Sequence, residues 1–153
     1  MGQGWVLERV HSGGQVGVNQ VALEVAQFLS YKTGGIAPKH WRTDAGPAPW
    51  LQSRYGLVES GFKGYGPRTD ANVYHAEATV WFGLHDSAGR VRTFQAIARY
   101  KKPSLTNPSV SELQDFILHG GFRIINVAGH RLRTHPEAAA TARVVLTAGL
   151  LPF

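Results

Sequence analysis

Apolar residues follow two spacings along this 153-residue chain, and the two alternate from one end to the other. Short, nearly continuous apolar runs are typical of strands and occur at residues 5–11, 78–84 and 122–128, with a weaker candidate at 102–105. Apolar positions three and four residues apart are typical of one helix face and occur in residues 18–31, 91–100, 113–117 and 138–150. Residues 68–76 predict a further short helix.

Capping residues mark several of these helix boundaries. Two pairs have the spacing of a capping box, Ser109 with Glu112 and Thr134 with Glu137. The helix that follows the first box is expected to end at Gly120, and Thr69 or Asp70 is expected near the start of helix 68–76. We expect residues 34–52, with three prolines and three glycines, to be irregular apart from one short strand at their start. Residues 61–67 and 85–89 predict a loop and a turn.

The order of strands and helices determines the expected fold class. A strand followed by a helix, repeated about four times, predicts an α/β fold with a central, mostly parallel sheet and helices on both faces. The length suits a single domain over residues 1–153. Ligands of such sheets bind beyond the carboxyl ends of the strands, so the loops that follow strands are the first places to look for function.

Composition excludes several classes of protein. With 43% hydrophobic and 17% charged residues, the chain does not resemble a disordered protein. It has no apolar run near the roughly 18 residues of a membrane span, and no basic segment followed by an apolar one at its start. We therefore expect a cytoplasmic protein without a membrane partner. The lack of cysteine excludes disulfides, thiolate metal sites and cysteine nucleophiles.

Positive charge is concentrated in two parts of the chain. The net charge is +6, and residues 90–102 contain five basic side chains and no acidic one, while residues 32–68 contain six basic and two acidic ones. Such a surface favours anions, including phosphorylated ligands and nucleic acid. A solvated basic face that only keeps the protein soluble is an equally good interpretation.

Three loops contain residues that suit an anion. The first, residues 12–19, joins a strand to a helix, and its glycines allow a ligand to approach the backbone. It lacks the spacing of a Walker A or GxGxxG motif, so tight packing explains it equally well. The second contains Arg68 and Thr69 at a helix start, with Asn72 one turn on, and simple helix capping is the alternative. The third follows the strand at 122–128 and contains Gly129, His130, Arg131 and Arg133, which otherwise form an exposed polar junction.

Catalytic constellations are sparse by comparison. His75 and Glu77 form an HxE pair without a second ligand motif, and no HExxH or GxSxG sequence is present. Four carboxylates could act as general bases, but none is tied to a nucleophile: Asp44, Asp70, Glu77 and Asp86. The residues favour an anion-binding module over an enzyme.

Four motifs in order resemble one family, the molybdenum cofactor carrier proteins. They are Ser12-Gly13-Gly14-Gln15-Val16-Gly17 with Ala22-Leu23; Gly34-Gly35 with Pro38-Lys39 and Thr43-Asp44-Ala45-Gly46-Pro47; Arg68-Thr69-Asp70-Ala71-Asn72-Val73; and Ile125-Asn126-Val127-Ala128-Gly129. They span nearly the whole chain. The chain departs from the family's usual Thr at Val16 and usual Asp at Asn19.

The resemblance implies a Rossmann-like three-layer fold of the SLOG group, a homo-oligomer, and reversible binding of molybdopterin or another phosphorylated nucleotide-like ligand without chemistry. The residues expected to bind it are Ser12, Gly13, Gly14, Gln15, Gly17, Lys39, Arg68, Thr69, Asn72, Asn126, Gly129 and His130. No metal ligand or catalytic residue is expected. The PGGxGTxxE motif of the phosphoribohydrolase relatives is missing, which argues against nucleotide hydrolysis.

Three alternatives remain open at this point. The pocket could sense or sequester a nucleotide-derived signal. The protein could be a weak hydrolase that uses Asp44 or Asp70. Nucleic-acid binding through the basic loops suits the charge, but no recognisable motif supports it.

Overall fold

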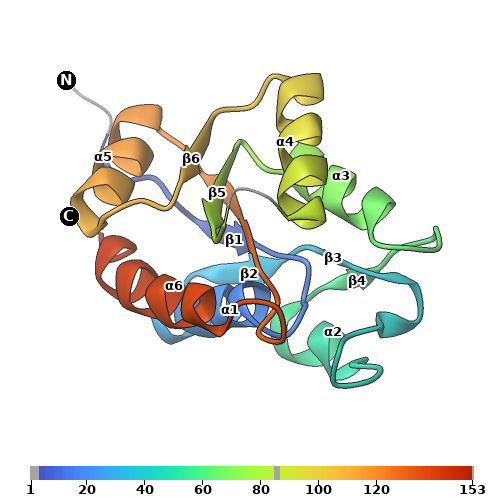
Figure 1. The fold of residues 1–153 in the computed structure, drawn as a ribbon. Helices are drawn as coiled ribbons and strands as arrows, with labels where there is room; N and C mark the ends of the chain where they lie inside the picture. Colours follow the sequence, from blue (N-terminus) through green and yellow to red (C-terminus); the bar gives the residue numbers. More distant parts are fainter. Residues whose placement is uncertain (1–3, 85–86, 153) are drawn as a thin grey trace.

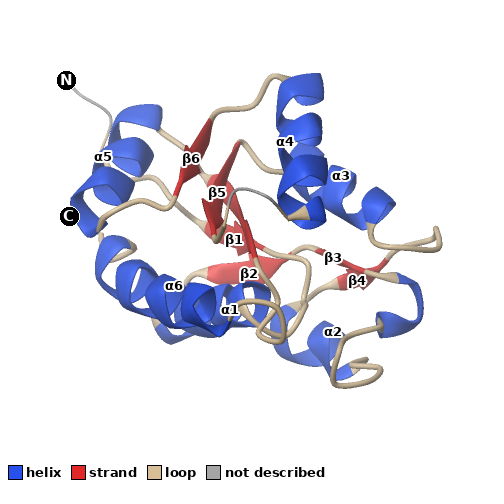
Figure 2. Ribbon diagram, viewed as in Figure 1, coloured by secondary structure: helices blue, strands red, loops and turns tan. Residues whose placement is uncertain are grey.

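A five-stranded parallel sheet forms the centre of the protein in a computed structural model that describes residues 4–84 and 87–152 (Figure 1). Its strands, in spatial order, are β2 (Lys32–Gly34), β1 (Arg9–His11), β7 (Ile124–Gly129), β5 (Ala78–Phe82) and β6 (Ser104–Thr106). The longer helices are α1 (Val18–Phe28), α3 (Gly66–His75), α4 (Ala88–Tyr100), α5 (Val110–Gly120) and α6 (Pro136–Gly149). The predicted alternation of strands and helices is confirmed (Figure 2).

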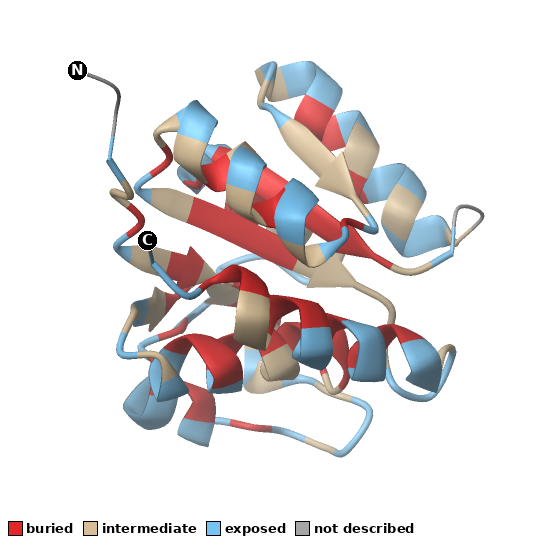
Figure 3. Cartoon of the chain, turned by 90° about the vertical axis from the view of Figure 1, so that its left-hand side faces the viewer, coloured by how far each residue is buried: buried red, intermediate tan, exposed pale blue. Residues whose placement is uncertain are grey.

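The helices form two layers, one on each face of the sheet. Helices α1, α5 and α6 contribute to one large apolar core with strands β1, β5 and β7, and α3 packs against α4 on the opposite face. Every residue of β5 is buried, as its continuous apolar sequence predicts (Figure 3). The Rossmann-like three-layer architecture is therefore confirmed.

Local sequence accounts for the start of α5. The Ser109 hydroxyl accepts a hydrogen bond from the Glu112 N–H at 3.2 Å, and the Glu112 carboxylate accepts one from the Ser109 N–H at 2.8 Å. This is the predicted capping box. The corresponding prediction at Thr134 and Glu137 is wrong. Helix α6 begins after His135 without a side-chain cap, because the Thr134 hydroxyl donates to the Arg131 carbonyl in the preceding turn.

Helix α3 begins two residues earlier than predicted. Pro67 lies in its first turn, a position that the fixed φ of proline favours, so neither Thr69 nor Asp70 caps the helix. The Thr69 hydroxyl donates to the Tyr65 carbonyl at 3.0 Å, and Asp70 pairs with Arg92. Helix α1 is shorter than predicted, because Ser30 adopts a positive φ of 70° just after it. The first strand is also shorter, since only residues 9–11 pair with neighbours on both sides.

The segment predicted to be irregular contains more structure than expected. It includes β3 (Ile36–Ala37), a 3-10 turn η1 (Lys39–Trp41) and α2 (Trp50–Tyr55), and β3 pairs in parallel with β4 (Val58–Glu59). Short elements such as these have too few positions for a periodic pattern. They bury a second apolar cluster, which includes Leu23, Leu51 and Leu57. The turn predicted at 85–89 includes Asp86, which lies outside the described residues, and β5 ends at Phe82 rather than at Leu84.

None of the helices in the described residues is long and apolar enough to cross a membrane.

Candidate functional site

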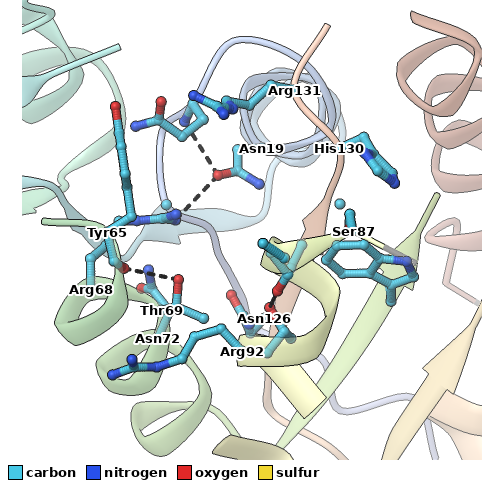
Figure 4. Close-up of a pocket in the computed structure, with 18 of the residues that line it drawn as sticks. Asn19, Tyr65, Arg68, Thr69, Asn72, Ser87, Arg92, Asn126, His130 and Arg131 are labelled. Carbon is cyan, nitrogen blue, oxygen red and sulfur yellow. Dashed lines mark hydrogen bonds between the residues drawn. The ribbon is translucent and has the colours of Figure 1, made fainter. Parts of the chain in front are cut away.

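A cavity of about 480 Å³ opens at the carboxyl ends of β1, β5 and β7. This is the edge of the sheet where parallel folds bind ligands. Its walls come from the glycine-rich loop after β1 (residues 12–17), from the start of α3, from the start of α4 and from the end of β7 with the turn that follows (Figure 4). Four segments far apart in the sequence therefore meet around one space.

Most of the residues predicted to bind a ligand line this cavity. They are Gly13, Gln15, Arg68, Thr69, Asn72, Asn126, Gly129 and His130. The remaining four, Ser12, Gly14, Gly17 and Lys39, are not among its lining residues. The structure thus brings together the three loops that the sequence singled out and separates some of their residues from the cavity.

The residues outside the cavity contact the protein itself. The Ser12 hydroxyl donates to the Val127 carbonyl at 2.9 Å and joins the glycine-rich loop to β7. A side chain on Gly14 would face Leu51 and Leu57 in the second apolar cluster. Gly17, at a φ of 129°, pairs with Arg131 in an isolated bridge, where a Cβ would lie 2.5 Å from the Leu132 nitrogen. Lys39 begins the turn η1.

Arg68 lies directly against the glycine-rich loop. A Cβ built on Gly13 would stand 1.6 Å from the Nη1 atom of Arg68, so the guanidinium occupies the space that a side chain would fill. Its one polar contact in the described residues is a long hydrogen bond, 3.4 Å, to the Asn19 side-chain oxygen. No carboxylate there lies within ion-pair distance of it. The pKa of Arg68 is lowered to about 10, mainly by burial; Tyr65 opposes this shift, and the nearby Arg131 contributes to it.

Part of the backbone that could hold an anion is already bonded. The Gln15 N–H donates to the Asn19 side-chain oxygen at 3.3 Å, and the Val18 N–H at the start of α1 donates to the His130 carbonyl at 3.2 Å. An anion at this loop would therefore depend on side chains such as Arg68 more than on a complete ring of N–H groups.

The side chain of Asn72 is also hydrogen-bonded within the protein. Its carboxamide accepts from the Ile36 N–H at 2.8 Å and donates to the Ile36 carbonyl at 3.0 Å, which fastens β3 to α3. Asn126 donates a long hydrogen bond of 3.4 Å to the Thr79 hydroxyl on the next strand. Both residues line the cavity, but Asn72 has a clear structural role there.

Four buried polar atoms on the cavity's residues have no hydrogen-bond partner in the part of the chain that the structure describes. They are the side-chain oxygen of Gln15, the Nε of Arg68, the indole Nε1 of Trp81 and the Nε2 of His130. Buried polar groups are almost always hydrogen-bonded, because leaving one unpaired costs about 1–3 kcal/mol. Their concentration around one cavity is what a site for a polar ligand would produce.

The wall opposite Arg68 is aromatic. His130 lies edge-on to Trp81, with 5.8 Å between ring centroids, and 5.4 Å from the ring of His135. Burial lowers the pKa of His130; the Leu84 carbonyl opposes this shift, and His135 adds to it. A neutral imidazole beside an indole suits a planar, uncharged ring system. Figure 4 shows Arg68 and Tyr65 on one side of the space and His130 on the other.

Sequence reasoning missed several lining residues. They include Asn19, Tyr65, Trp81, Ser87, Arg92 and Thr93. Trp81 lies within a strand whose apolar pattern indicates only burial. Arg92 lies in α4, outside the three loops that suit an anion, and it forms a bidentate ion pair with Asp70 at 2.9 and 2.6 Å. Arg131 was recognised as a potential anion contact but was not included in the predicted set.

Three of the four carboxylates considered as general bases form ion pairs or hydrogen bonds within the protein, and the fourth, Asp86, lies outside the described residues. Asp44 pairs with Arg131 at 3.0 Å and lies 3.9 Å from Arg133, and Asp70 pairs with Arg92. Glu77 accepts hydrogen bonds from the N–H groups of Arg123 and Ile124. No group of three or more metal-ligating side chains occurs within residues 4–84 and 87–152. In the described residues, the HxE pair of His75 and Glu77 therefore has no metal-binding companion.

Two comparisons with known proteins match almost the whole chain. The model of the circularly permutated YpsA SLOG family matches residues 10–150. A crystal structure described as "Putative molybdenum carrier protein", from Syntrophus aciditrophicus SB, is similar with a TM-score of 0.86 and 25% sequence identity, over 97% of this chain and 98% of that one. No curated protein matches the sequence. The resemblance predicted from the four motifs is confirmed, and the chain belongs to the circularly permutated YpsA SLOG family.

Proposed function

We propose that this protein reversibly binds a phosphorylated ligand of the molybdopterin or nucleotide type and carries out no chemistry on it. One observation supports this most directly: the desolvated guanidinium of Arg68 lies against the glycine-rich loop without a carboxylate partner in the described part of the chain. A buried charge is costly unless it is paired, and a phosphate would supply both the charge and the hydrogen-bond acceptors that Arg68 lacks.

The two ends of the cavity suit two parts of one molecule. Arg68 and Arg131 make one end cationic, whereas Trp81 and His130 make the other aromatic. A phosphate attached to a planar heterocycle matches this arrangement, since it has an anionic end for the arginines and a flat aromatic end for the other wall. The name of the similar Syntrophus protein adds support for a molybdenum-related ligand.

Native mass spectrometry of the purified protein tests this proposal. We expect a co-purified mass that is lost on denaturation and that contains phosphorus. A thermal-shift titration with a pterin phosphate, its dephosphorylated form and a nucleotide monophosphate then identifies the group that is recognised. Stabilisation should follow ligand concentration and reach roughly 2.7 kcal/mol at a hundredfold excess over Kd. If no phosphorylated pterin or nucleotide raises the Tm at any concentration, the proposal is wrong.

A further inference from the structure

Three arginines surround one tyrosine at the edge of the cavity. The guanidinium carbons of Arg42, Arg68 and Arg131 lie 5.7, 5.8 and 5.7 Å from the centroid of the Tyr65 ring. The residues come from three separate segments: the loop after η1, helix α3 and the turn after β7. Attraction between a cation and an aromatic face accounts for each contact alone, whereas like charges gathered around one ring repel one another.

The glycine-rich loop holds all three arginines in place. Arg68 lies against Gly13, in the space where a Cβ would stand. The Gln15 carboxamide donates to the Arg42 carbonyl at 2.8 Å. Gly17 forms a bridge with Arg131. A single loop therefore positions three positive charges around Tyr65, so their proximity is a consequence of the fold.

The acidic side chains nearby do not neutralise this cluster. Asp44 is the carboxylate paired with Arg131, and it also lies near Arg133. Neither Arg42 nor Arg68 has an ion-pair partner among the residues that the structure describes. Arg92 also lines the cavity, but Asp70 compensates its charge. At least two positive charges beside Tyr65, those of Arg42 and Arg68, therefore have no carboxylate partner in the described residues.

We propose that the site binds a diphosphate group, as in a dinucleotide or nucleoside diphosphate form of the ligand, rather than a single phosphate. One phosphate would pair with Arg68 beside Gly13. The second would pair with Arg42, which does not itself line the cavity but lies 5.7 Å from the ring of Tyr65, a lining residue. This inference rests on the proposed function, because it refines the ligand class of the same cavity. Arginine suits the role, since its planar fork can bind two phosphate oxygens at once.

Titration with inorganic phosphate and inorganic pyrophosphate at constant ionic strength tests the proposal. The wild-type protein should bind pyrophosphate roughly tenfold or more tightly than phosphate, as a second charge-assisted contact predicts. Arg42→Gln should remove most of this preference and leave phosphate affinity within about twofold, because the Arg42 backbone contact to Gln15 is preserved. Arg68→Lys should weaken both anions.

Arg54→Gln is the matched control. Arg54 also stacks on aromatic rings, 5.9 Å from Trp50 and 5.5 Å from Tyr55, but neither of these rings lines the cavity, so its removal lowers the net charge equally without touching the site. Affinity for both anions should stay unchanged in this variant.

Two outcomes would overturn the diphosphate proposal and leave the proposed phosphate site intact. One is equal wild-type affinity for the two anions, with phosphate binding still dependent on Arg68. The other is an Arg42→Gln variant that loses phosphate and pyrophosphate affinity to the same extent, or that loses no more pyrophosphate affinity than Arg54→Gln. If neither anion binds the wild-type protein, both this inference and the proposed phosphate site are wrong.

Discussion

The guanidinium of Arg68 occupies the space that a side chain at position 13 would need: the Nη1 atom lies 1.6 Å from where a Gly13 Cβ would stand. Glycine at this position therefore lets an arginine from α3 reach the loop after β1. This relationship links the two parts of the sequence that most resemble an anion site.

Gly13→Ala should weaken phosphate binding roughly tenfold or more, because the new methyl group displaces Arg68 from the loop. The fold should tolerate the change, with a loss of less than about 1 kcal/mol, since the atoms in the way belong to the end of a flexible side chain. Chemical denaturation and ligand titration measure the two effects separately.

Gly14→Ala is the companion variant. At a φ of 80° and facing Leu51, it should lose about 1–2 kcal/mol of stability, yet the folded protein should keep its affinity. The reverse pattern, with binding lost only at Gly14, would place the anion on the other side of the loop.

Asn19→Asp should also weaken anion binding by roughly tenfold. The substitution places a carboxylate at the atom that lies 3.4 Å from Arg68, so Arg68 gains an internal partner and the site loses one net positive charge. Gln52→Glu, an exposed change of the same charge on α2, is the control and should have little effect. Unchanged affinity in Asn19→Asp would show that Arg68 does not contact the ligand.

Asn72→Ala should destabilise the protein by about 2–3 kcal/mol, because it leaves the N–H and carbonyl of Ile36 without their side-chain partner. Urea denaturation measures this loss. Ligand affinity, determined well below the unfolding transition, should change much less than in Gly13→Ala. A stable variant with abolished binding would instead make Asn72 a ligand contact.

Acid should destabilise the protein through His11. Burial, with Arg9 and His75 adding to it, lowers the pKa of His11 from 6.5 to about 4. The unfolded chain therefore binds a proton that the folded chain does not, and stability falls as the pH drops from 6.5 to 4, by on the order of 3 kcal/mol. His11→Asn should flatten the denaturation profile over this window, whereas the exposed His119→Gln should not. Equal slopes in both variants would assign the acid sensitivity to other groups.

Periodic patterns predicted the main layers, because long elements repeat their burial pattern many times. The five buried residues of β5 and the capping box at Ser109 are clear examples. The strand β2 and the helix α2 were not predicted, since three and six residues contain too little periodicity to distinguish them from loops. Tertiary packing against Leu23, rather than local sequence, stabilises α2.

The candidate site was predictable where chemistry and chain position coincide. Arg68 lies at the start of helix α3, and Asn126 and Gly129 lie in the carboxyl-terminal part of strand β7; all three suit an anion site and line the cavity. Trp81 was not predictable, because an indole in a buried strand has the same sequence signature whether it faces the core or a cavity. The orientation of Gly14 away from the cavity and toward the second apolar cluster likewise depends on Leu51, which is 37 residues away in the sequence.

The most direct test of a specific phosphate site is a titration of the wild-type protein and Arg68→Lys with a phosphorylated pterin and with a DNA oligomer, each at two salt concentrations. Lysine keeps the net charge at +6 but loses the fork, so pterin phosphate affinity should fall roughly tenfold or more, while DNA binding, if any, should be the same in both proteins and fall steeply with salt. Equal pterin phosphate affinities for the two proteins, together with salt-sensitive DNA binding in both, would contradict the proposed site and favour a general nucleic-acid-binding surface.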